Sequence, residues 1–454
     1  MKNVVTTSGS VRRRRSDWPR ALVALLASLA LATRAQALDL SDEGLGREDT
    51  VAYRDGLRKW DNAKRFGAER VVDRDRTMYQ PDGVRAGNYM VYPALGTTVL
   101  FDDNIYATNK NRASDVRFEI VPVVRAKSDL PRHILDFAVG AKLTEYVRHQ
   151  ELNTADFRFN MDGALHFDNA HTLSFSLLSA LDHEDRASPD APKNAAEKTE
   201  VFHNRAIIGL KRDAGRLWAS FSTLIERWDF QDVKARDGST IDQKMRDTQL
   251  AAAQAMLGYR FSPGFEVQGK VRMLRQDNFG AKSASADFSA YGYEAVAGVS
   301  AEISPLLRWR LLGGYGVRDY DSIDMRTAGN GLIEAEVQWL PTQLMTFTAI
   351  ARRAFAEGIL GEGAGGRIDN SVSAKVEYEV FRNLVFTFGG EYRESEFLSE
   401  SRRDRVMIGR VGADYYYTKN WLFSLGLEHQ TQRSNIEEDN MTRNRVWLST
   451  KLRF

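Results

Sequence analysis

From residue 89 to its end, the chain is a succession of segments in which apolar and polar residues alternate. In "HILDFAVGAKLTEY", for example, Leu135 and Phe137 lie on one face and Lys142 lies on the other. Alternate residues of a β-strand point to opposite faces, so this period predicts strands with one apolar and one polar face. Eighteen such segments are present, near residues 89–101, 114–127, 132–148, 155–167, 171–183, 200–212, 215–229, 246–261, 264–276, 288–303, 306–320, 329–340, 343–355, 369–381, 384–396, 404–418, 421–433 and 443–454.

The connections between these segments alternate between short and long. "SDLP", "SPGF" and "LPTQ" are short, whereas "LDHEDRASPDAPKNAAEKTE" and "QDVKARDGSTIDQKMRD" are long. This alternation is typical of an outer-membrane barrel, with short periplasmic turns and long extracellular loops. We therefore predict an all-β, antiparallel up-and-down transmembrane barrel of about eighteen strands, within a range of sixteen to eighteen. An even number of strands places both termini in the periplasm of a Gram-negative bacterium.

The overall composition fits this prediction. Charged residues make up 27% of the 454 residues, and mean hydropathy is −0.42. These values do not exclude a membrane barrel, because only alternate residues of its strands face lipid. The formal net charge of +2 argues against a nucleic-acid partner. The chain has no cysteine, which excludes disulfides and thiolate metal sites.

Three regions follow along the chain. Residues 1–37 read as an export signal, because the basic "VRRRRSDWPR" precedes the apolar "ALVALLASLALA", and small residues place cleavage after Ala37. Residues 38–88 are expected to be a periplasmic segment that is partly flexible or forms a short helix, with docking or plugging of the barrel as the alternative. Residues 89–454 form the predicted barrel.

The C-terminal "NRVWLSTKLRF" predicts the last strand. Its apolar face matches the signal that the barrel assembly machinery recognises, and it consists of Val446, Leu448, Thr450, Leu452 and Phe454. This strand must pair with the first one, near "YMVYPALGTTVLF", because an open sheet edge is not tolerated in lipid. Six aromatic residues beside short turns or the terminus predict an interfacial girdle: Phe261, Trp339, Phe381, Tyr417, Trp421 and Phe454.

The polar faces of the strands predict a charged, hydrated lumen. Seven cations are expected at its periplasmic mouth, and two more lie farther along: Arg125, Lys211, Arg260, Arg308, Arg310, Lys451 and Arg453, then Lys270 and Arg272. A ring of cations would attract an anion, and a polyanion most strongly. The alternative is that these cations pair with Glu266, Glu302 and Glu379 and only make the wall rigid.

No catalytic constellation is apparent. The seven histidines show no pair at metal-ligand spacing, and neither a nucleophile elbow nor a phosphate-binding glycine loop occurs. We therefore expect neither enzymatic activity nor a cofactor nor a metal.

Two further stretches carry a family resemblance. "MYQPDGVRAGNYMVYPALGTTVLFDDNIYAT" resembles the start of the putative beta-barrel porin 2 family, above all in "DGVRAGNYMVYP" and "FDDNIYAT". The next stretch, "RASDVRFEIVPVVRAKSDLPRHILDFAVGAKLTEY", fits the family's following hairpin. The resemblance implies a proteobacterial outer-membrane barrel, and many members are associated with exopolysaccharide gene clusters.

Three functions remain open at this point. The first is passive export of an acidic extracellular polysaccharide through the basic lumen, together with periplasmic polysaccharide-export proteins. The second is a general or substrate-specific porin for small solutes, in which the loop "GILGEGAGGRIDN" forms a constriction. The third is a structural or adhesion barrel that transports nothing. Lipid of the outer membrane and the barrel assembly machinery are expected partners in each case.

Overall fold

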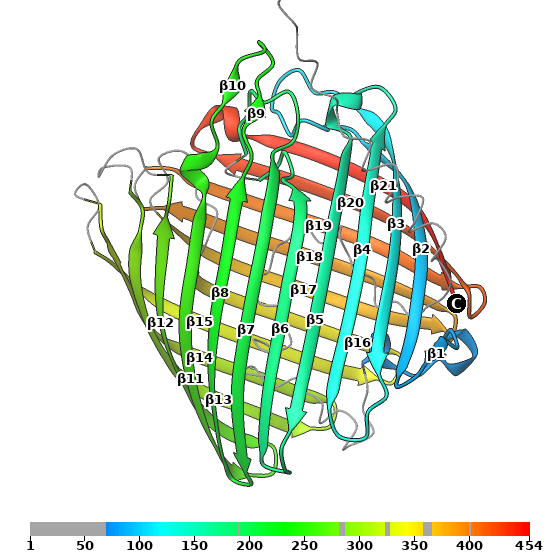
Figure 1. Cartoon of the computed structure of the whole chain (residues 1–454), viewed down its shortest axis with the longest axis vertical. Helices are drawn as coiled ribbons and strands as arrows, with labels where there is room; N and C mark the ends of the chain where they lie inside the picture. The colour runs from blue at the N-terminus through cyan, green and yellow to red at the C-terminus, as the bar shows by residue number, and fades with distance from the viewer. Residues whose placement is uncertain (1–69, 189–190, 281–286, 323–326, 357–365, 399–400) are drawn as a thin grey trace, which may run out of the picture.

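The computed structural model describes residues 70–188, 191–280, 287–322, 327–356, 366–398 and 401–454, and the expected export signal lies outside them. One antiparallel sheet runs around the molecule and closes on itself (Figure 1). This 19-stranded sheet consists of eighteen long strands and β1 (Val84–Ala86), which pairs with β2 alone. Closure occurs between β2 and β21, with Leu95 opposite Leu452 and Asp102 opposite Arg445.

The long strands match the eighteen alternating segments, so the predicted barrel is confirmed. They are β2 (Tyr89–Asp102), β3 (Asp115–Ser128), β4 (Ile134–Tyr146), β5 (Thr154–His166), β6 (His171–His183), β7 (Glu200–Ala214), β8 (Leu217–Phe230), β11 (Thr248–Ser262), β12 (Phe265–Asn278), β13 (Ala290–Ser304), β14 (Leu307–Tyr320), β15 (Ala328–Thr342), β16 (Met345–Ala356), β17 (Arg367–Phe381), β18 (Leu384–Phe397), β19 (Arg403–Tyr416), β20 (Trp421–Ser434) and β21 (Met441–Arg453). The remaining elements are short: β9 (Val233–Lys234), β10 (Thr240–Ile241), and the 3₁₀ turns η2 (Val71–Asp73), η3 (Thr77–Tyr79), η4 (Gln150–Leu152), η5 (Lys244–Arg246) and η7 (Glu437–Asp439).

The connections alternate in length, as predicted. We call one end of the barrel the short-turn rim; its turns comprise residues 129–133, 167–170, 215–216, 263–264, 305–306, 343–344, 382–383 and 417–420. The opposite end, which carries the longer connections together with β9 and β10, is the long-loop rim (top of Figure 1). Four short turns follow a register shift, for example between Arg260 and Ser262, which adds a residue to one strand.

Burial is inverted relative to a water-soluble protein. On β7 the apolar Ile208 and Leu210 are exposed on the outside, whereas the alternate residues Val201 and His203 are buried. An apolar exterior is stable where the strands contact lipid, because no water has to be ordered around it. Among the described residues, no helix is long and apolar enough to cross a bilayer.

Two tryptophans on the inner wall pack closely against glycines of adjacent strands. A Cβ atom on Gly426 would lie 2.0 Å from the Trp447 ring, and one on Gly258 would lie 2.3 Å from the Trp218 ring. The alternation places these glycines on the interior face, where the rings cover their bare backbone. A glycine is therefore required wherever a large ring packs against the wall at this distance.

Candidate functional site: the lumen wall and its two rims

The nine basic residues predicted for the lumen lie on the interior-facing positions of their strands. Register shows this directly, since Arg260 lies opposite Glu266 and Arg308 lies opposite Glu302 and Gln338. Those expected at the periplasmic mouth all lie near the short-turn rim: Arg125, Lys211, Arg260, Arg308, Arg310, Lys451 and Arg453. Lys270 and Arg272 lie farther along β12.

Most of these cations face a carboxylate. Arg260 donates to both carboxylate oxygens of Asp213 at 2.7 Å and lies 3.4 Å from Glu266. The other ion pairs are Arg308–Glu302 at 3.5 Å, Arg310–Glu336 at 3.2 Å, Arg272–Glu294 at 3.8 Å and Lys270–Glu334. Lys211 and Lys451 also interact with neighbouring groups. Three of the seven cations at this rim, Arg260, Arg308 and Arg310, therefore lie against carboxylates, as in the alternative in which they stiffen the wall.

The Lys270–Glu334 pair spans several strands, from β12 to β15. The interior positions between them include Gly298 and Gly314, which have no side chain to obstruct the contact. Arg318 and Arg272 extend this network by sharing Glu294, at 2.5 and 3.8 Å. A buried network of this kind is stable only when each charge has a partner.

In the wall between β17 and β20, two cations are much more exposed than the carboxylates with which they pair. Lys375 pairs with Glu377 at 2.5 Å and Arg410 pairs with Glu428 at 2.6 Å. The cations are 49% and 36% exposed, but the carboxylates are only 2% and 4% exposed. Both cations lie opposite Gly389, so their Cα atoms are two strand spacings apart, about 10 Å. Positive groups therefore face the lumen here, with their counter-charges behind them.

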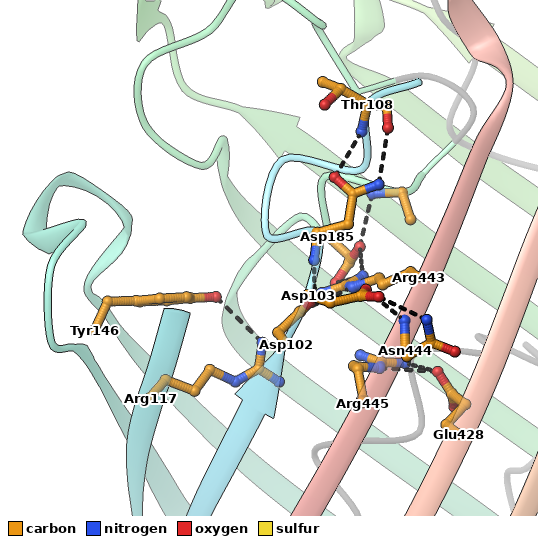
Figure 2. A network of polar contacts seen from close by, with 12 residues as sticks. Asp102, Asp103, Thr108, Arg117, Tyr146, Asp185, Glu428, Arg443, Asn444 and Arg445 are labelled. Carbon is orange, nitrogen blue, oxygen red and sulfur yellow. Dashed lines mark hydrogen bonds and ion pairs between the residues drawn. The ribbon is translucent and has the colours of Figure 1, made fainter. Parts of the chain in front are cut away.

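At the long-loop rim, a buried arginine connects the closing strands to a distant loop (Figure 2). Arg443 of β21 donates to Asp102 of β2 at 2.6 and 2.8 Å, and to Asp185 of the β6–β7 connection at 2.9 Å. The arginine side chain is 2% exposed. Beside it, Arg445 donates to Glu428 at 2.8 Å. Glu428 also accepts a hydrogen bond from Arg410 at 2.6 Å, so this carboxylate pairs with two arginines.

Sequence analysis did not identify Arg443, Asp102 or Asp185 as site residues. The stretch "FDDNIYAT" could have indicated this site, since its residues Asp102, Asp103 and Asn104 all bind groups at the closing seam. Asn104 donates its side-chain amide to the carbonyl oxygens of Thr108 and Thr442, and Asp103 accepts from Asn444. The motif therefore secures the closing seam and shapes the β2–β3 connection.

The β6–β7 and β8–β11 connections reach across the long-loop rim. A β-bridge joins Ala195 to Ala235, so the two connections pack together. Arg236 lies over the Tyr106 ring of the β2–β3 connection at 4.5 Å, and Lys193 lies 3.6 Å from Asp439 near the start of β21. The opening at this end is therefore narrowed by connections whose strands lie four to seven positions from β2 around the wall.

Burial, together with a hydrogen bond to Glu151, raises the pKa of Tyr106 to about 12. The tyrosine therefore stays neutral in the physiological range and donates its O–H to that carboxylate at 2.6 Å. Its ring is thereby held in place for the contact with Arg236.

All six predicted girdle residues lie beside the short-turn rim. Phe261, Trp339, Phe381, Tyr417 and Trp421 are exposed on the outer surface. The rings of Trp421 and Tyr417 both pack on Phe423, at 6.2 and 6.3 Å between centroids. Phe454 follows the last residue of β21 at the same rim.

The C-terminal strand has the predicted two faces. Val446 and Leu448 are exposed outside, whereas Arg445 and Arg453, at positions of the opposite parity, are buried. Thr450 and Leu452 continue the outer face and pair with Phe423 and Trp421 of β20. Recognition of this face by the assembly machinery stays a prediction.

In the described part of the chain, no group of three or more metal-ligating side chains is close enough together to hold a metal ion. His203 lies 2.7 Å from Glu226 and stacks on Trp228, so it belongs to the wall.

A model of the Putative beta-barrel porin 2 family matches residues 76–454. No curated protein matches the chain in sequence. Among solved structures, the chain is similar to OccK3 (OpdO) of Pseudomonas aeruginosa, at 12% identity over 80% of this chain and 95% of that one, with a TM-score of 0.43. OccAB4 of Acinetobacter baumannii is 12% identical over 84% and 100%, with a TM-score of 0.45. OccK2 (OpdF), solved in complex with glucuronate, is 10% identical over 80% and 98%, with a TM-score of 0.43. These distant likenesses carry no information on the solute of this chain.

Proposed function

Because the chain belongs to the Putative beta-barrel porin 2 family, we propose that it is a diffusion channel for small water-soluble solutes, with a preference for anions. Barrels of 16–18 strands leave room for an aqueous channel. The charged lining supports a hydrated interior, since ionised groups are stable there only when they are paired or in contact with water.

The observation that carries the anion preference is the unequal exposure of two ion pairs. Lys375 and Arg410 face the lumen with exposures of 49% and 36%, whereas Glu377 and Glu428 are almost fully buried behind them. A permeating ion therefore meets the cationic ends first. Low-dielectric walls strengthen the field of such charges in a narrow passage.

Export of a polysaccharide was the leading expectation from the sequence, and it rested on the family resemblance, the wide even-stranded barrel and the basic mouth. Three of the seven cations near the short-turn rim instead pair with carboxylates: Arg260 with Asp213, Arg308 with Glu302 and Arg310 with Glu336. The long-loop rim is crossed by chain from the β6–β7 and β8–β11 connections. Both features favour the small-solute alternative. The loop expected to form a constriction lies outside the described residues over 357–365.

We further propose that the short-turn rim, with both termini, faces the periplasm. The girdle beside it would then lie at the periplasmic interface, and the long loops would be extracellular.

The test is conductance of the purified full-length protein in planar bilayers. We expect stable ion conductance and, under a potassium chloride gradient, a reversal potential that indicates chloride preference. Liposome swelling should be faster with small carboxylates than with neutral sugars of similar size. A lack of conductance would support the structural or adhesion barrel, and a cation-selective reversal potential would contradict the assignment of Lys375 and Arg410.

A further inference from the structure

The chain that precedes the first barrel strand is docked inside the short-turn rim (lower right of Figure 1). We call residues 70–79, "RVVDRDRTMY", the strap. Val71 is fully buried, and its N–H donates to Oγ1 of Thr346 at 3.0 Å. Thr346 is the second residue of β16 and is buried on the interior face. The start of the strap therefore lies within the barrel, just inside the rim.

One buried carboxylate of the wall forms ion pairs with two arginines of the strap. Glu379 of β17 is 1% exposed and lies 2.8 Å from Arg76 and 3.2 Å from Arg74, both of the strap. Arg382, in the adjacent turn, lies 3.6 Å from the same carboxylate. Arg76 also donates to the carbonyl oxygen of Val71 at 2.8 Å, which fixes the bend of the strap. Glu379 was expected to pair with wall cations, but its closest partners come from the strap.

The other end of the strap rests on an aromatic platform. Arg76 and Arg453 each lie 5.4 Å from the centre of the Tyr416 ring, a distance typical of cation–π contacts. Tyr79 packs on the same ring at 6.5 Å, and Arg453 donates to the carbonyl oxygen of Tyr79 at 3.2 Å. Arg453, expected to be part of an open cationic mouth, therefore holds the strap.

The path of the strap follows from these anchors. Beyond it, Asp82 pairs with Lys419, and the β1–β2 hairpin returns the chain to the wall. In the order β2–β21–β20–β19–β18–β17–β16, the anchor on β16 lies six strands from β2 around the eighteen-stranded wall. The strap thus spans a chord of the opening instead of following one strand.

The barrel does not depend on the strap for its sheet. Pairing of β16 with β17 begins at Met345 and Tyr378, and β17 with β18 continues to Phe381 and Leu384, without any residue of the strap. The strap is held by ion pairs, ring contacts and single hydrogen bonds, so it can leave while the sheet stays closed. We infer that the strap is a gate at the short-turn rim, which narrows the channel when docked and widens it when released.

This inference rests on the proposed channel function. The test uses the full-length protein in planar bilayers, with Glu379→Gln and the double variant Arg74→Ala/Arg76→Ala. Removing one side of a buried ion pair should shift the docked-to-released ratio about a hundredfold towards release. We therefore expect a higher mean single-channel conductance in both variants. Arg85→Ala is the matched control, because Arg85 belongs to an exposed pair with Asp129 on the hairpin beside the strap.

A cross-link separates gating from loss of structure. The protein has no cysteine, so Val71→Cys/Thr346→Cys introduces one defined pair. In the Glu379→Gln background, the oxidised cross-link should restore the wild-type conductance, and reduction should raise it again in the same channel. Equal conductance in all variants and redox states would overturn the gate and leave the channel function standing. No conductance in any of them would overturn both.

Discussion

Arg443 of β21 and Asp102 of β2 form a buried ion pair across the seam at which the barrel closes, with two guanidinium N–H groups 2.6 and 2.8 Å from one carboxylate oxygen. These residues are 341 positions apart in the chain. Asp185 binds the same arginine at 2.9 Å, so one side chain joins the first strand, the last strand and the β6–β7 connection.

Replacing Arg443 by methionine should destabilise the barrel by about 3–5 kcal/mol, because Asp102 would stay buried without its partner. The loss can be measured from heat-dependent unfolding of the detergent-purified protein on gels. Arg405→Met is the control, since Arg405 pairs with Glu394 on the exposed surface. A loss of stability of equal size in both variants would show that the Arg443–Asp102 pair contributes no more to stability than an exposed ion pair.

Charge reversal at the exposed lumen cations should reverse ion selectivity. In Lys375→Glu/Arg410→Glu we expect the anion-to-cation permeability ratio to fall by about tenfold, because the field at the wall changes sign. Reversal potentials in bilayers measure this ratio. Lys270→Gln, at a buried cation in the β12–β15 network, serves for comparison. If Lys270→Gln changes the permeability ratio as strongly, the exposed cations of the β17–β20 wall do not determine ion selectivity.

Phe454→Asp should greatly reduce the amount of folded barrel in the outer membrane, because it removes the terminal ring from both the girdle and the predicted assembly signal. Quantitative blotting of folded and unfolded forms measures this. Tyr417→Asp places the same charge in the girdle away from the terminus. If the assembly defect of Tyr417→Asp is milder, the additional defect of Phe454→Asp results from loss of the assembly signal. Normal insertion of Phe454→Asp would refute the predicted signal.

The β5–β6 turn should lose stability only in strong acid. A hydrogen bond with His171, together with the backbone N–H groups of Ala170 and His171, lowers the pKa of Asp168 to about 2 from its ordinary 3.8. Because the folded-state pKa is the lower one, the stabilisation is complete above 3.8 and is lost as pH falls through about 2.

The difference in melting temperature between the wild type and Asp168→Asn should therefore be constant near neutral pH and vanish in strong acid. When Asp168→Asn is made in a His171→Gln background, most of this difference in melting temperature should be absent, since the hydrogen bond with His171 is the largest cause of the lowered pKa of Asp168. A difference in melting temperature that grows as pH falls would contradict this prediction.

The strands, their two faces and the two rims could be predicted from the local alternation of apolar and polar residues and from the lengths of the connections. A strand in a membrane barrel meets lipid on one side and the lumen on the other, and this contrast repeats every two residues in sequence. The same period placed Arg308 and Lys451 on the inner face and Phe261 and Trp421 on the outer one. Closure of the last strand on the first followed from the cost of an open edge in lipid.

Alternation assigns a face to a side chain, but it says nothing about which charge will lie beside it. Arg443 meets Asp102 because the sheet closes into a ring, and it meets Asp185 because a connection crosses the opening. Glu379 takes its arginines from residues 74 and 76, about 300 positions away, because the strap folds back into the rim. Such partners depend on closure and on the paths of irregular segments, and these are set by contacts between distant parts of the chain.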